Sequence, residues 1–311
     1  MSRGILLIGK HGQVGSDLAE LLPRVCTRLL ALDRTQLDLS KPADARRIIR
    51  DFQPALIVNA AAYTAVDRAE SDEQSAQIVN ADFPALLAEE AKRIGSGLVH
   101  YSTDYVFDGT KSSPYEENDL PNPLGVYGKT KLAGEQAIRD SGVSHLIFRI
   151  AWIYSTHGRN FLLSILRLAL QREELRIVSD QTGAPTRSRE VSRATTAAIE
   201  TLLESSTGAF SLDRVSGTYH MGSGGVTTWY DFARAILDEV SHAPPNLSWL
   251  ASELNGRPIF ARHIVPITSA EYLTPARRPA YSVLSSTLLA RTFGIRLPDW
   301  RAQLHSAFAD R

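Results

Sequence analysis

Five short apolar runs alternate with segments of helical periodicity, and this alternation restricts the fold of the chain more than any other feature. The runs lie at residues 5–8, 29–32, 56–58, 98–101 and 145–150. They lack the polar alternation of a half-exposed strand, which is typical of strands covered on both faces. Helices are predicted at residues 14–22, 43–52 and 76–94, with Pro84 as a break or kink in the last. Strands that alternate with helices predict right-handed βαβ units, and therefore an α/β fold with a doubly wound parallel sheet.

A glycine-rich segment follows the first apolar run and precedes the first predicted helix. Its glycines are Gly9, Gly12 and Gly15, spaced as G-x-x-G-x-x-G. Glycines let the backbone approach a pyrophosphate, and the N-terminus of a helix offers free N–H groups to it. The spacing differs from the common G-x-G-x-x-G pattern, and a simple tight turn is the alternative interpretation. The order of strand, loop and helix favours a Rossmann-type dinucleotide site.

An acidic residue ends the second apolar run, where dinucleotide-binding folds place a ribose contact. Asp33 lies 18 residues after Gly15 and can accept hydrogen bonds from the adenosine ribose. Its neighbour Arg34 is suited instead to a 2′-phosphate. The alternative is a turn residue beside a solvated charge. The pair predicts a nicotinamide cofactor and leaves the choice between NADH and NADPH open.

The pattern becomes less regular after Trp152. Helices are predicted at residues 161–171, 188–204 and 229–240, the last capped by Thr228, with a short strand at 176–178. The sequence from His242 onward is rich in proline and predicted to be irregular. We therefore predict an NAD(P)-binding Rossmann domain over residues 1–151 and a smaller, mixed C-terminal substrate-binding lobe mainly over residues 152–311. Some segments after residue 152 are expected to return to the first domain.

Charge and cysteine content exclude several classes of protein. The 34 basic and 34 acidic residues balance, so no global field favours a nucleic acid or an anionic membrane surface. The single cysteine, Cys26, cannot form an internal disulfide and is predicted to be a small buried hydrophobe. The first apolar run is far shorter than a membrane span, and no cleavage site follows it. The predicted location is the cytoplasm, with no nucleic-acid or membrane partner.

A tyrosine and a lysine four residues apart suggest redox chemistry. Tyr127 and Lys131 would share one face of a helix. A nearby ammonium lowers the pKa of a phenol toward the working range, so that Tyr127 can give a proton to a carbonyl oxygen while a hydride arrives at carbon. Thr103, at the end of the fourth run, places a hydroxyl where a substrate carbonyl would bind. The alternative is a surface helix that carries a tyrosine and two lysines.

Several stretches together resemble the dTDP-4-dehydrorhamnose reductase family of extended short-chain dehydrogenases/reductases. They are residues 9–15, 59–67 (NAAAYTAVD), 102–109 (STDYVFDG), 126–135 (VYGKTKLAGE), 149–152, 180–186, 227–229 and 274–279. The likeness covers nearly the whole chain. It implies NAD(P)H-dependent reduction of the C4 ketone of a dTDP-4-keto-6-deoxysugar, dTDP-6-deoxy-L-lyxo-4-hexulose, to dTDP-L-rhamnose.

The resemblance also implies roles for individual residues. Tyr127 would be the general acid, Lys131 its electrostatic tuner, and Thr103 a partner of the reacting oxygen. The implied cofactor-binding residues are Gly9, Gly12, Gln13, Val14, Gly15, Asp33, Arg34, Asp38, Leu39, Ala61, Ala62, Tyr63, Thr64, Tyr127 and Lys131. The implied substrate-binding residues are Thr103, Asp104, Trp152 and Arg278. Asp104 as a turn residue, Trp152 as core and Arg278 as a solvated charge are the alternatives.

Some members of this family are dimers bridged by magnesium, which implies a homodimer. Asp17 and Glu190 match two of the acidic ligands, but no third ligand is identified, so the sequence predicts no metal site and leaves Mg²⁺ doubtful. Two other functions stay open. One is an epimerase or dehydratase of the same fold that regenerates its NAD in each turnover. The other is a non-catalytic regulatory subunit resembling the β subunit of methionine adenosyltransferase.

Overall fold

A six-stranded parallel sheet forms the base of the molecule. The computed structural model describes residues 4–203, 210–244 and 246–309. The strand order is β10-β5-β4-β3-β1-β2, and every neighbouring pair is parallel. The strands are β1 (Gly4–Ile8), β2 (Arg28–Leu32), β3 (Leu56–Asn59), β4 (Gly97–Thr103), β5 (His145–Ile150) and β10 (Gly217–His220). The predicted doubly wound α/β fold is confirmed, and β10 is a sixth strand that the apolar runs did not indicate.

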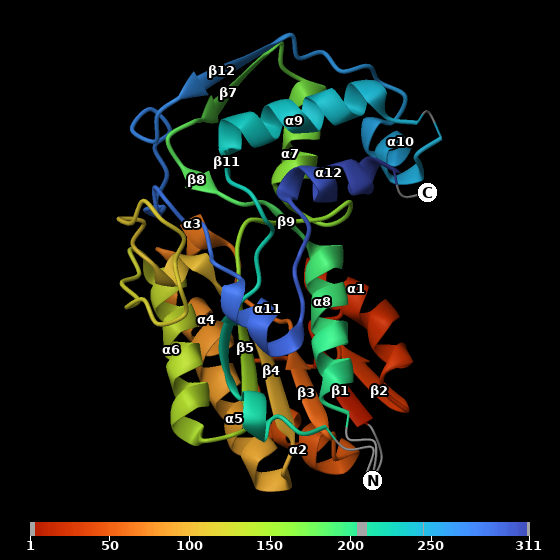
Figure 1. Cartoon of the computed structure of the whole chain (residues 1–311), viewed down its shortest axis with the longest axis vertical. Coiled ribbons are helices and arrows are strands. Elements are labelled where there is room, and N and C mark those ends of the chain that lie inside the picture. Colours follow the sequence, from red (N-terminus) through yellow and green to blue (C-terminus); the bar gives the residue numbers. More distant parts are fainter. Residues whose placement is uncertain (1–3, 204–209, 245, 310–311) are drawn as a thin grey trace.

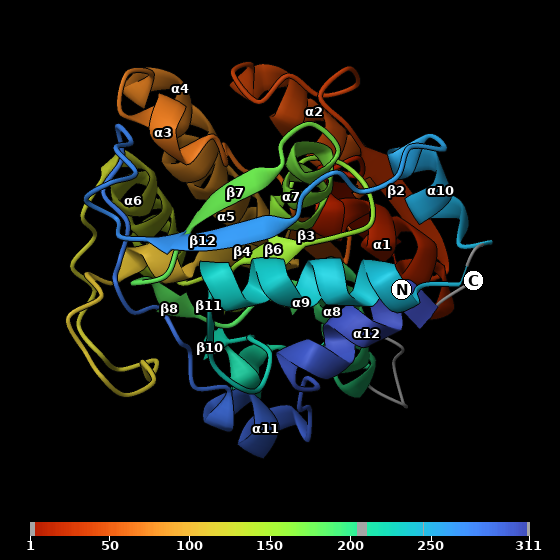
Figure 2. The ribbon, with the colours of Figure 1, turned by 90° about the horizontal axis from the view of Figure 1, so that it is seen from above.

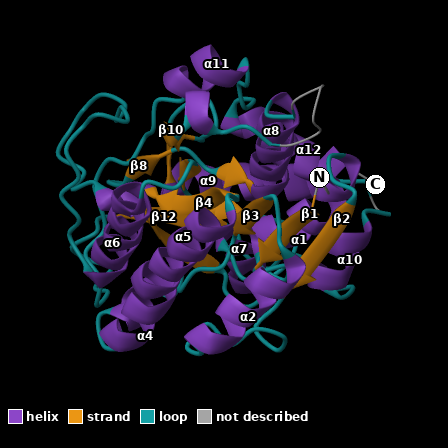
Figure 3. Cartoon of the chain, turned by 90° about the horizontal axis from the view of Figure 1, so that it is seen from below, coloured by secondary structure: helices purple, strands orange, loops and turns teal. Residues whose placement is uncertain are grey.

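Helices cover both faces of the sheet, which explains the apolar runs. α1 (Gln13–Leu21), α8 (Ser188–Thr201) and α11 (Thr287–Phe293) contribute to the core on one face; α2 (Pro42–Phe52), α5 (Phe83–Ile94) and α6 (Val126–Ser141) pack on the other (Figure 3). Within β1, Ile5 and Leu7 enter the first core, and Leu6 and Ile8 enter the second. Each face of the strand is buried, so no position along it is left for a polar side chain.

The order of the strands reverses at β1. β1 pairs with β2 on one side and with β3 on the other, so the chain winds in opposite directions from β1. In open parallel sheets a ligand binds outside the carboxyl ends of the strands at such a reversal. A functional site is therefore expected at the segments that follow β1 and β3.

The helix predicted at residues 76–94 begins earlier and is not broken at Pro84. It runs through α4 (Glu73–Gln77), a π-helical turn at Ile78–Asp82 and α5, which has Pro84 in its first turn. Pro84 has no N–H for the carbonyl of Asn80, four residues earlier, and the wider turn accommodates this missing bond. Gly134 of α6 packs against that carbonyl: a Cβ on Gly134 would lie 2.1 Å from the oxygen of Asn80.

A second lobe lies above the carboxyl ends of the strands (Figure 1). It packs a separate core between α7 (Phe161–Ala169), α9 (Trp229–His242), α10 (Ser248–Leu254), α12 (Trp300–Ala309) and the paired strands β7 (Glu174–Val178) and β12 (His263–Ile267). Figure 2 shows β7, β12 and α9 lying across the top of the molecule. The tail after His242 is only partly irregular: residues 255–262 and 268–286 contain no named helix or strand, as predicted, whereas α10, β12 and α12 contribute to this core.

Short elements join the two lobes. The paired two-residue strands are β6 (Ile153–Tyr154) with β9 (Thr186–Arg187) and β8 (Thr182–Gly183) with β11 (Thr227–Thr228). Elsewhere in the described chain there are four single-turn helices, which are not all at this junction. They are α3 (Val66–Ala69) and those at Leu22–Arg24, Asp104–Val106 and Asp213–Val215. The predicted cap is confirmed, because Thr228 accepts a hydrogen bond from the backbone N–H of Asp231.

Three other sequence predictions concern the burial of Cys26, the end of one helix and the presence of membrane-spanning helices. Cys26 is half-buried rather than buried, at the margin of the first core. The last residue of the helix predicted at 188–204 lies outside the described residues. Within the described part of the chain, no helix has both the length and the apolar character needed to cross a membrane.

Candidate functional site

The glycine loop after β1 has a shape that only glycine permits. Gly9 adopts φ +92°, and a Cβ on it would lie 2.8 Å from the backbone nitrogen of Ala61. A Cβ on Gly15 would lie 2.0 Å from the oxygen of Gly9. Gly12 precedes α1, whose first turn has no side-chain cap. The bare helix N-terminus and the close backbone approach form a cradle that fits the diphosphate of a dinucleotide.

The Asp33 carboxylate lies beside this loop and is densely hydrogen-bonded. Thr35 donates to it from both its hydroxyl (2.5 Å) and its backbone N–H (2.8 Å). Lys10 (3.3 Å) and His11 (3.0 Å) reach its other oxygen. These hydrogen bonds, first that of the Thr35 hydroxyl, hold the pKa of Asp33 well below its ordinary value. Asp33 is therefore anionic, and its position beyond β2 is the one predicted for a ribose contact.

The remaining residues predicted at the cofactor lie around the same edge of the sheet. Arg34 is exposed, and Asp38 binds the hydroxyl and N–H of Ser40. Leu39 is half-buried against the core under α2. Val14 is buried, and Gln13 accepts a hydrogen bond from Ser155 of the opposite lobe.

The segment at residues 61–64, after β3, is fixed by buried asparagines. Asn59 accepts from the N–H of Ala61 (3.2 Å), and Asn80 accepts from the N–H of Tyr63 (2.9 Å). Ala62 is half-buried and Thr64 is exposed. This segment adjoins the glycine loop, because Ala61 is the residue that a side chain on Gly9 would strike.

Tyr127 and Lys131 lie on α6, which packs closely on the end of β4. A Cβ on Gly128 would lie 2.2 Å from the carbonyl oxygen of Tyr105, so only glycine permits this approach. Lys131 is almost fully buried, at 1% exposure, and its Nζ donates to the carbonyl oxygen of Tyr101 at 2.6 Å. Tyr127 is half-buried, and the ring of Tyr105 meets it edge-on.

The pKa values of this pair differ from the sequence expectation. Burial raises the pKa of Tyr127 to about 12, although a hydrogen bond with the Thr103 side chain opposes the rise. Burial lowers the pKa of Lys131 to about 8, with a smaller opposing effect from Glu135. The expectation that the ammonium lowers the phenol's pKa is therefore wrong for the protein without ligands. Desolvation dominates at each group, and Lys131 is not among the groups that set the pKa of Tyr127.

Thr103 and Asp104 lie beside Tyr127 at the carboxyl end of β4. The Thr103 hydroxyl donates to Asp104 at 3.0 Å and accepts from the N–H of Tyr105 at 3.1 Å. Asp104 is buried, at 2% exposure, and its Oδ2 has no hydrogen-bond partner among the described residues. Burial raises the pKa of Asp104 to about 6. A buried acceptor without a partner is available to a hydroxyl group of a ligand.

The two remaining predicted residues, Trp152 and Arg278, connect the lobes. Trp152 has φ +48° and stacks on Trp229 of α9, with ring centroids 3.5 Å apart. Arg278 donates from both terminal nitrogens to Asp67, at 3.0 and 2.8 Å. The Arg278 guanidinium is therefore not a solvated surface charge but ties the C-terminal segment to α3.

Sequence reasoning missed two buried polar residues under Lys131. Asn59 ends β3, His100 lies within β4, and the two are paired in the sheet register. Both have 0% exposure. The available signal was a polar residue directly after three or fewer apolar residues in each strand, Asn59 after Leu56–Val58 and His100 after Leu98 and Val99.

The acidic residues considered for magnesium are bound to other side chains. Asp17 accepts from Ser188 and Arg189, and Glu190 pairs with Arg193. In the part of the chain that the structure describes, no three histidine, cysteine, aspartate or glutamate residues lie close enough together to hold a metal ion.

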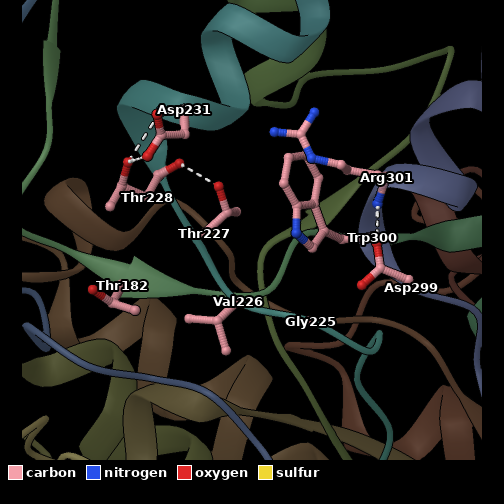
Figure 4. Close-up of a pocket in the computed structure, with 9 residues that line it drawn as sticks. All are labelled: Thr182, Gly225, Val226, Thr227, Thr228, Asp231, Asp299, Trp300 and Arg301. Atoms are coloured by element: carbon pink, nitrogen blue, oxygen red, sulfur yellow. Dashed lines mark hydrogen bonds between the residues drawn. The ribbon is translucent and has the colours of Figure 1, made fainter.

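A separate hollow opens beside the β8–β11 pair (Figure 4). It is lined by Thr182, residues 225–228, Asp231 and residues 299–301. Figure 4 shows Asp231 hydrogen-bonded to Thr228 and Arg301 hydrogen-bonded to Asp299. None of the predicted site residues lines it, so we assign the candidate site to the strand ends instead.

Comparisons with known proteins identify the family of the chain. The family model described as the RmlD substrate binding domain matches residues 2–311. A dTDP-4-dehydrorhamnose reductase of Burkholderia thailandensis is 48% identical over 298 residues, covering 96% of this chain and 95% of that protein. The enzyme of the same name from Salmonella typhimurium is 43% identical over 300 residues, covering 95% and 94%. The crystal structure of the Bacillus anthracis dTDP-4-dehydrorhamnose reductase in complex with NADP gives a TM-score of 0.86 at 28% identity, over all of both chains. The chain therefore belongs to the dTDP-4-dehydrorhamnose reductase family and is an NAD(P)H-dependent oxidoreductase.

Proposed function

We propose that this protein reduces the C4 ketone of dTDP-6-deoxy-L-lyxo-4-hexulose and so forms dTDP-L-rhamnose. The observation that carries the proposal is the grouping of Thr103, Tyr127 and Lys131 beside a glycine cradle, in a chain 48% identical to a dTDP-4-dehydrorhamnose reductase. A proton donor, a lysine beside it and a dinucleotide cradle are the groups that carbonyl reduction in this family would use.

Binding of NADPH or NADH would use the residues around the glycine loop. The backbone at Gly12, Gln13 and Val14 would hold the diphosphate, and Asp33 or Arg34 the adenosine ribose. The segments at residues 38–39 and 61–64 would border the adenine and the nicotinamide, and Lys131 would hold the nicotinamide ribose. When bound, the cofactor supplies the hydride that reduces the ketone carbon.

The protein's own residues would manage the proton. Tyr127 would donate the phenolic proton to the ketone oxygen, for which its raised pKa keeps it in the un-ionised form at neutral pH. Thr103, hydrogen-bonded to Tyr127, would turn its hydroxyl proton from Asp104 to the same oxygen. Asp104 would accept a hydrogen bond from a sugar hydroxyl through its unpaired Oδ2. Trp152 would pack on the sugar ring, and Arg278 would keep the substrate side of the cleft in place through Asp67.

Cofactor oxidation with the dTDP-4-ketosugar tests this function. Wild type should oxidise one NADPH per product, and Tyr127→Phe should lower kcat by two or more orders of magnitude, a typical effect of losing a general acid. Tyr219→Phe is the matched control: it removes a buried phenol hydroxyl from β10, which donates to the backbone oxygen of Val215 and is also hydrogen-bonded to the Thr292 side chain. Equal losses in both variants would contradict the assignment of Tyr127.

The same assay separates the other two functions. Conversion of a sugar nucleotide without net oxidation of added NADPH would indicate an epimerase or dehydratase. Cofactor binding without turnover, together with a stable complex with a synthetase, would indicate a regulatory subunit. We also propose a homodimer, which sedimentation with and without Mg²⁺ would test.

A further inference from the structure

We propose that Asn59 and His100 are positioning residues for Lys131, and that the tautomer they fix favours its neutral amine over its ammonium in the cofactor-free protein. The inference deepens the proposed function, because it concerns the protonation of the residue that would assist Tyr127. It comes from the direction of the hydrogen bonds in a chain of buried groups.

The chain starts at a backbone group whose role is fixed. The N–H of Ala61 can only donate, so the Asn59 atom 3.2 Å from it is the carbonyl oxygen, Oδ1. The amide group Nδ2 of Asn59 then faces Nδ1 of His100 at 3.1 Å. Since Nδ2 carries only donors, Nδ1 of His100 must accept.

The tautomer of His100 in turn determines which protonation form of Lys131 can hydrogen-bond to it. A neutral imidazole has one donor and one acceptor nitrogen, so acceptance at Nδ1 places the proton on Nε2. Nε2 lies 3.3 Å from Nζ of Lys131. An ammonium has no lone pair, so its N–H groups would face this N–H donor without a hydrogen bond. A neutral amine can accept a hydrogen bond from Nε2–H. The amine still donates to the carbonyl oxygen of Tyr101 at 2.6 Å.

The reverse arrangement is costly in this environment. Turning the Asn59 amide would free Nε2 to accept from an ammonium, but Nδ2 would then face the Ala61 N–H, donor against donor. All three side chains are buried, at 0% exposure for Asn59 and His100 and 1% for Lys131, so water does not satisfy the lost bond. The amide orientation is therefore fixed by the backbone that it binds.

The charged groups nearby agree with a neutral amine. Glu135, one turn farther along α6, favours the ammonium, but its carboxylate is bound to Arg149 of β5 and to Arg139. Burial lowers the pKa of Lys131 in spite of Glu135, and it lowers that of His100 well below its ordinary value. Tyr127 on the same helix and Asp104 beside it both have raised pKa values. A neutral Lys131 leaves Tyr127 as a phenol, which is the form with a proton to donate.

Nuclear magnetic resonance of the cofactor-free protein tests the proposal without substrate. The chain has only six lysines and eight histidines, so lysine Cε and histidine ring signals are few. The Lys131 signal is assigned by its loss in Lys131→Arg. In wild type, Lys131 should titrate more than one pH unit below the other five lysines. The ring nitrogens should show His100 as the Nε2–H tautomer, with no protonation down to pH 5.

Asn59→Asp should reverse the arrangement. A carboxylate facing Nδ1 makes that nitrogen the donor, so Nε2 becomes an acceptor and the ammonium is favoured. The titration midpoint of Lys131 should rise by about one pH unit or more, and His100 should change to the Nδ1–H tautomer. Asn80→Asp is the matched control: Asn80 is equally buried but binds Tyr63 and Thr130, so both readouts should stay at wild-type values.

The outcomes distinguish this proposal from the proposed function. An Nδ1–H tautomer in wild type, or a Lys131 that titrates with the other lysines, overturns the proposal even if the enzyme reduces its substrate. A protein with the expected tautomer and titration but without reductase activity overturns the function alone. If Asn59→Asp fails to fold, the tautomer of His100 in the wild-type protein still decides whether the proposal holds.

Discussion

Replacing Arg149 with methionine is expected to destabilise the protein strongly, and more at neutral than at acid pH. Arg149 binds the buried carboxylate of Glu135 with two hydrogen bonds, Nε to Oε1 at 2.9 Å and Nη2 to Oε2 at 2.7 Å. Removing one partner of a buried ion pair costs about 3–5 kcal/mol of unfolding free energy. Arg139 still holds Oε2 at 3.0 Å, so we expect the lower end of this range, about 3 kcal/mol.

The pH dependence follows from the two states of Glu135. In wild type its pKa lies below the ordinary value: burial favours the neutral acid, but the hydrogen bonds of Arg149 outweigh it. The stability from this pair is therefore present above the unfolded pKa, about 4.3, and is lost as the pH falls through the folded value. Without Arg149, burial raises the pKa of Glu135, and the penalty grows as the pH rises above about 4.3. The deficit of Arg149→Met should therefore be largest at pH 7, clearly smaller near pH 4.5, and lost only below the folded pKa of Glu135 in wild type.

Urea unfolding at these two pH values measures the effect. Arg139→Met is the matched control, because Arg139 binds the same carboxylate but is 32% exposed, and its loss should cost less than about 1 kcal/mol. The double variant Glu135→Leu/Arg149→Met should recover most of the loss, since no charge remains unpaired. A deficit that is equal at both pH values, or equal in the two arginine variants, would refute the electrostatic explanation.

Three further perturbations test other parts of the structure. Gly15→Ala should abolish NADPH binding in a fluorescence titration, whereas Gly217→Ala, whose Cβ would meet nothing closer than 3.8 Å, should bind normally; equal binding would contradict the fit of the cradle. Asp104→Asn should gain stability relative to wild type as the pH rises from about 4 to about 6, because the folded pKa of Asp104 is raised; urea midpoints that run parallel over this range would exclude a raised pKa. Asp67→Asn should cost about 1 kcal/mol or less and raise KM for the sugar nucleotide but not for NADPH, and unchanged KM values would show that the tie to Arg278 positions nothing.

The parallel sheet could be predicted because its signal is local. A strand such as β1, buried on both faces, needs an unbroken apolar run, and this run is visible without knowing which helices cover it. β10 has no such run: its first residues, Gly217 and Thr218, are half-buried at the edge of the sheet. The tail after His242 was partly misread for a related reason, because its prolines lie between helices whose apolar residues, such as Trp300 and Leu304, find partners only in distant segments.

The shared helix face of Tyr127 and Lys131 could be predicted from the sequence, but the electrostatics around them could not. The spacing of Tyr127 and Lys131 places both on one face of a helix, and the helix exists as predicted. Their pKa values depend on how completely neighbouring segments remove water, which spacing alone does not convey. The part played by Asn59 and His100 was invisible for the same reason, since it arises from the register between two strands.

The order in which the chain visits the two lobes has a consequence for how it can be divided. After β5 and β6 the chain builds α7 and β7 above, returns to the sheet for α8 and β10, and then goes back up for α9. Neither lobe is built from one continuous segment of the chain. Dividing the chain at a single position therefore does not separate the two lobes. During synthesis β5 lacks its second partner strand until β10, which ends at His220, has left the ribosome. A chimaera that joins half of this chain to half of a relative is therefore expected to mix the two parents within both lobes.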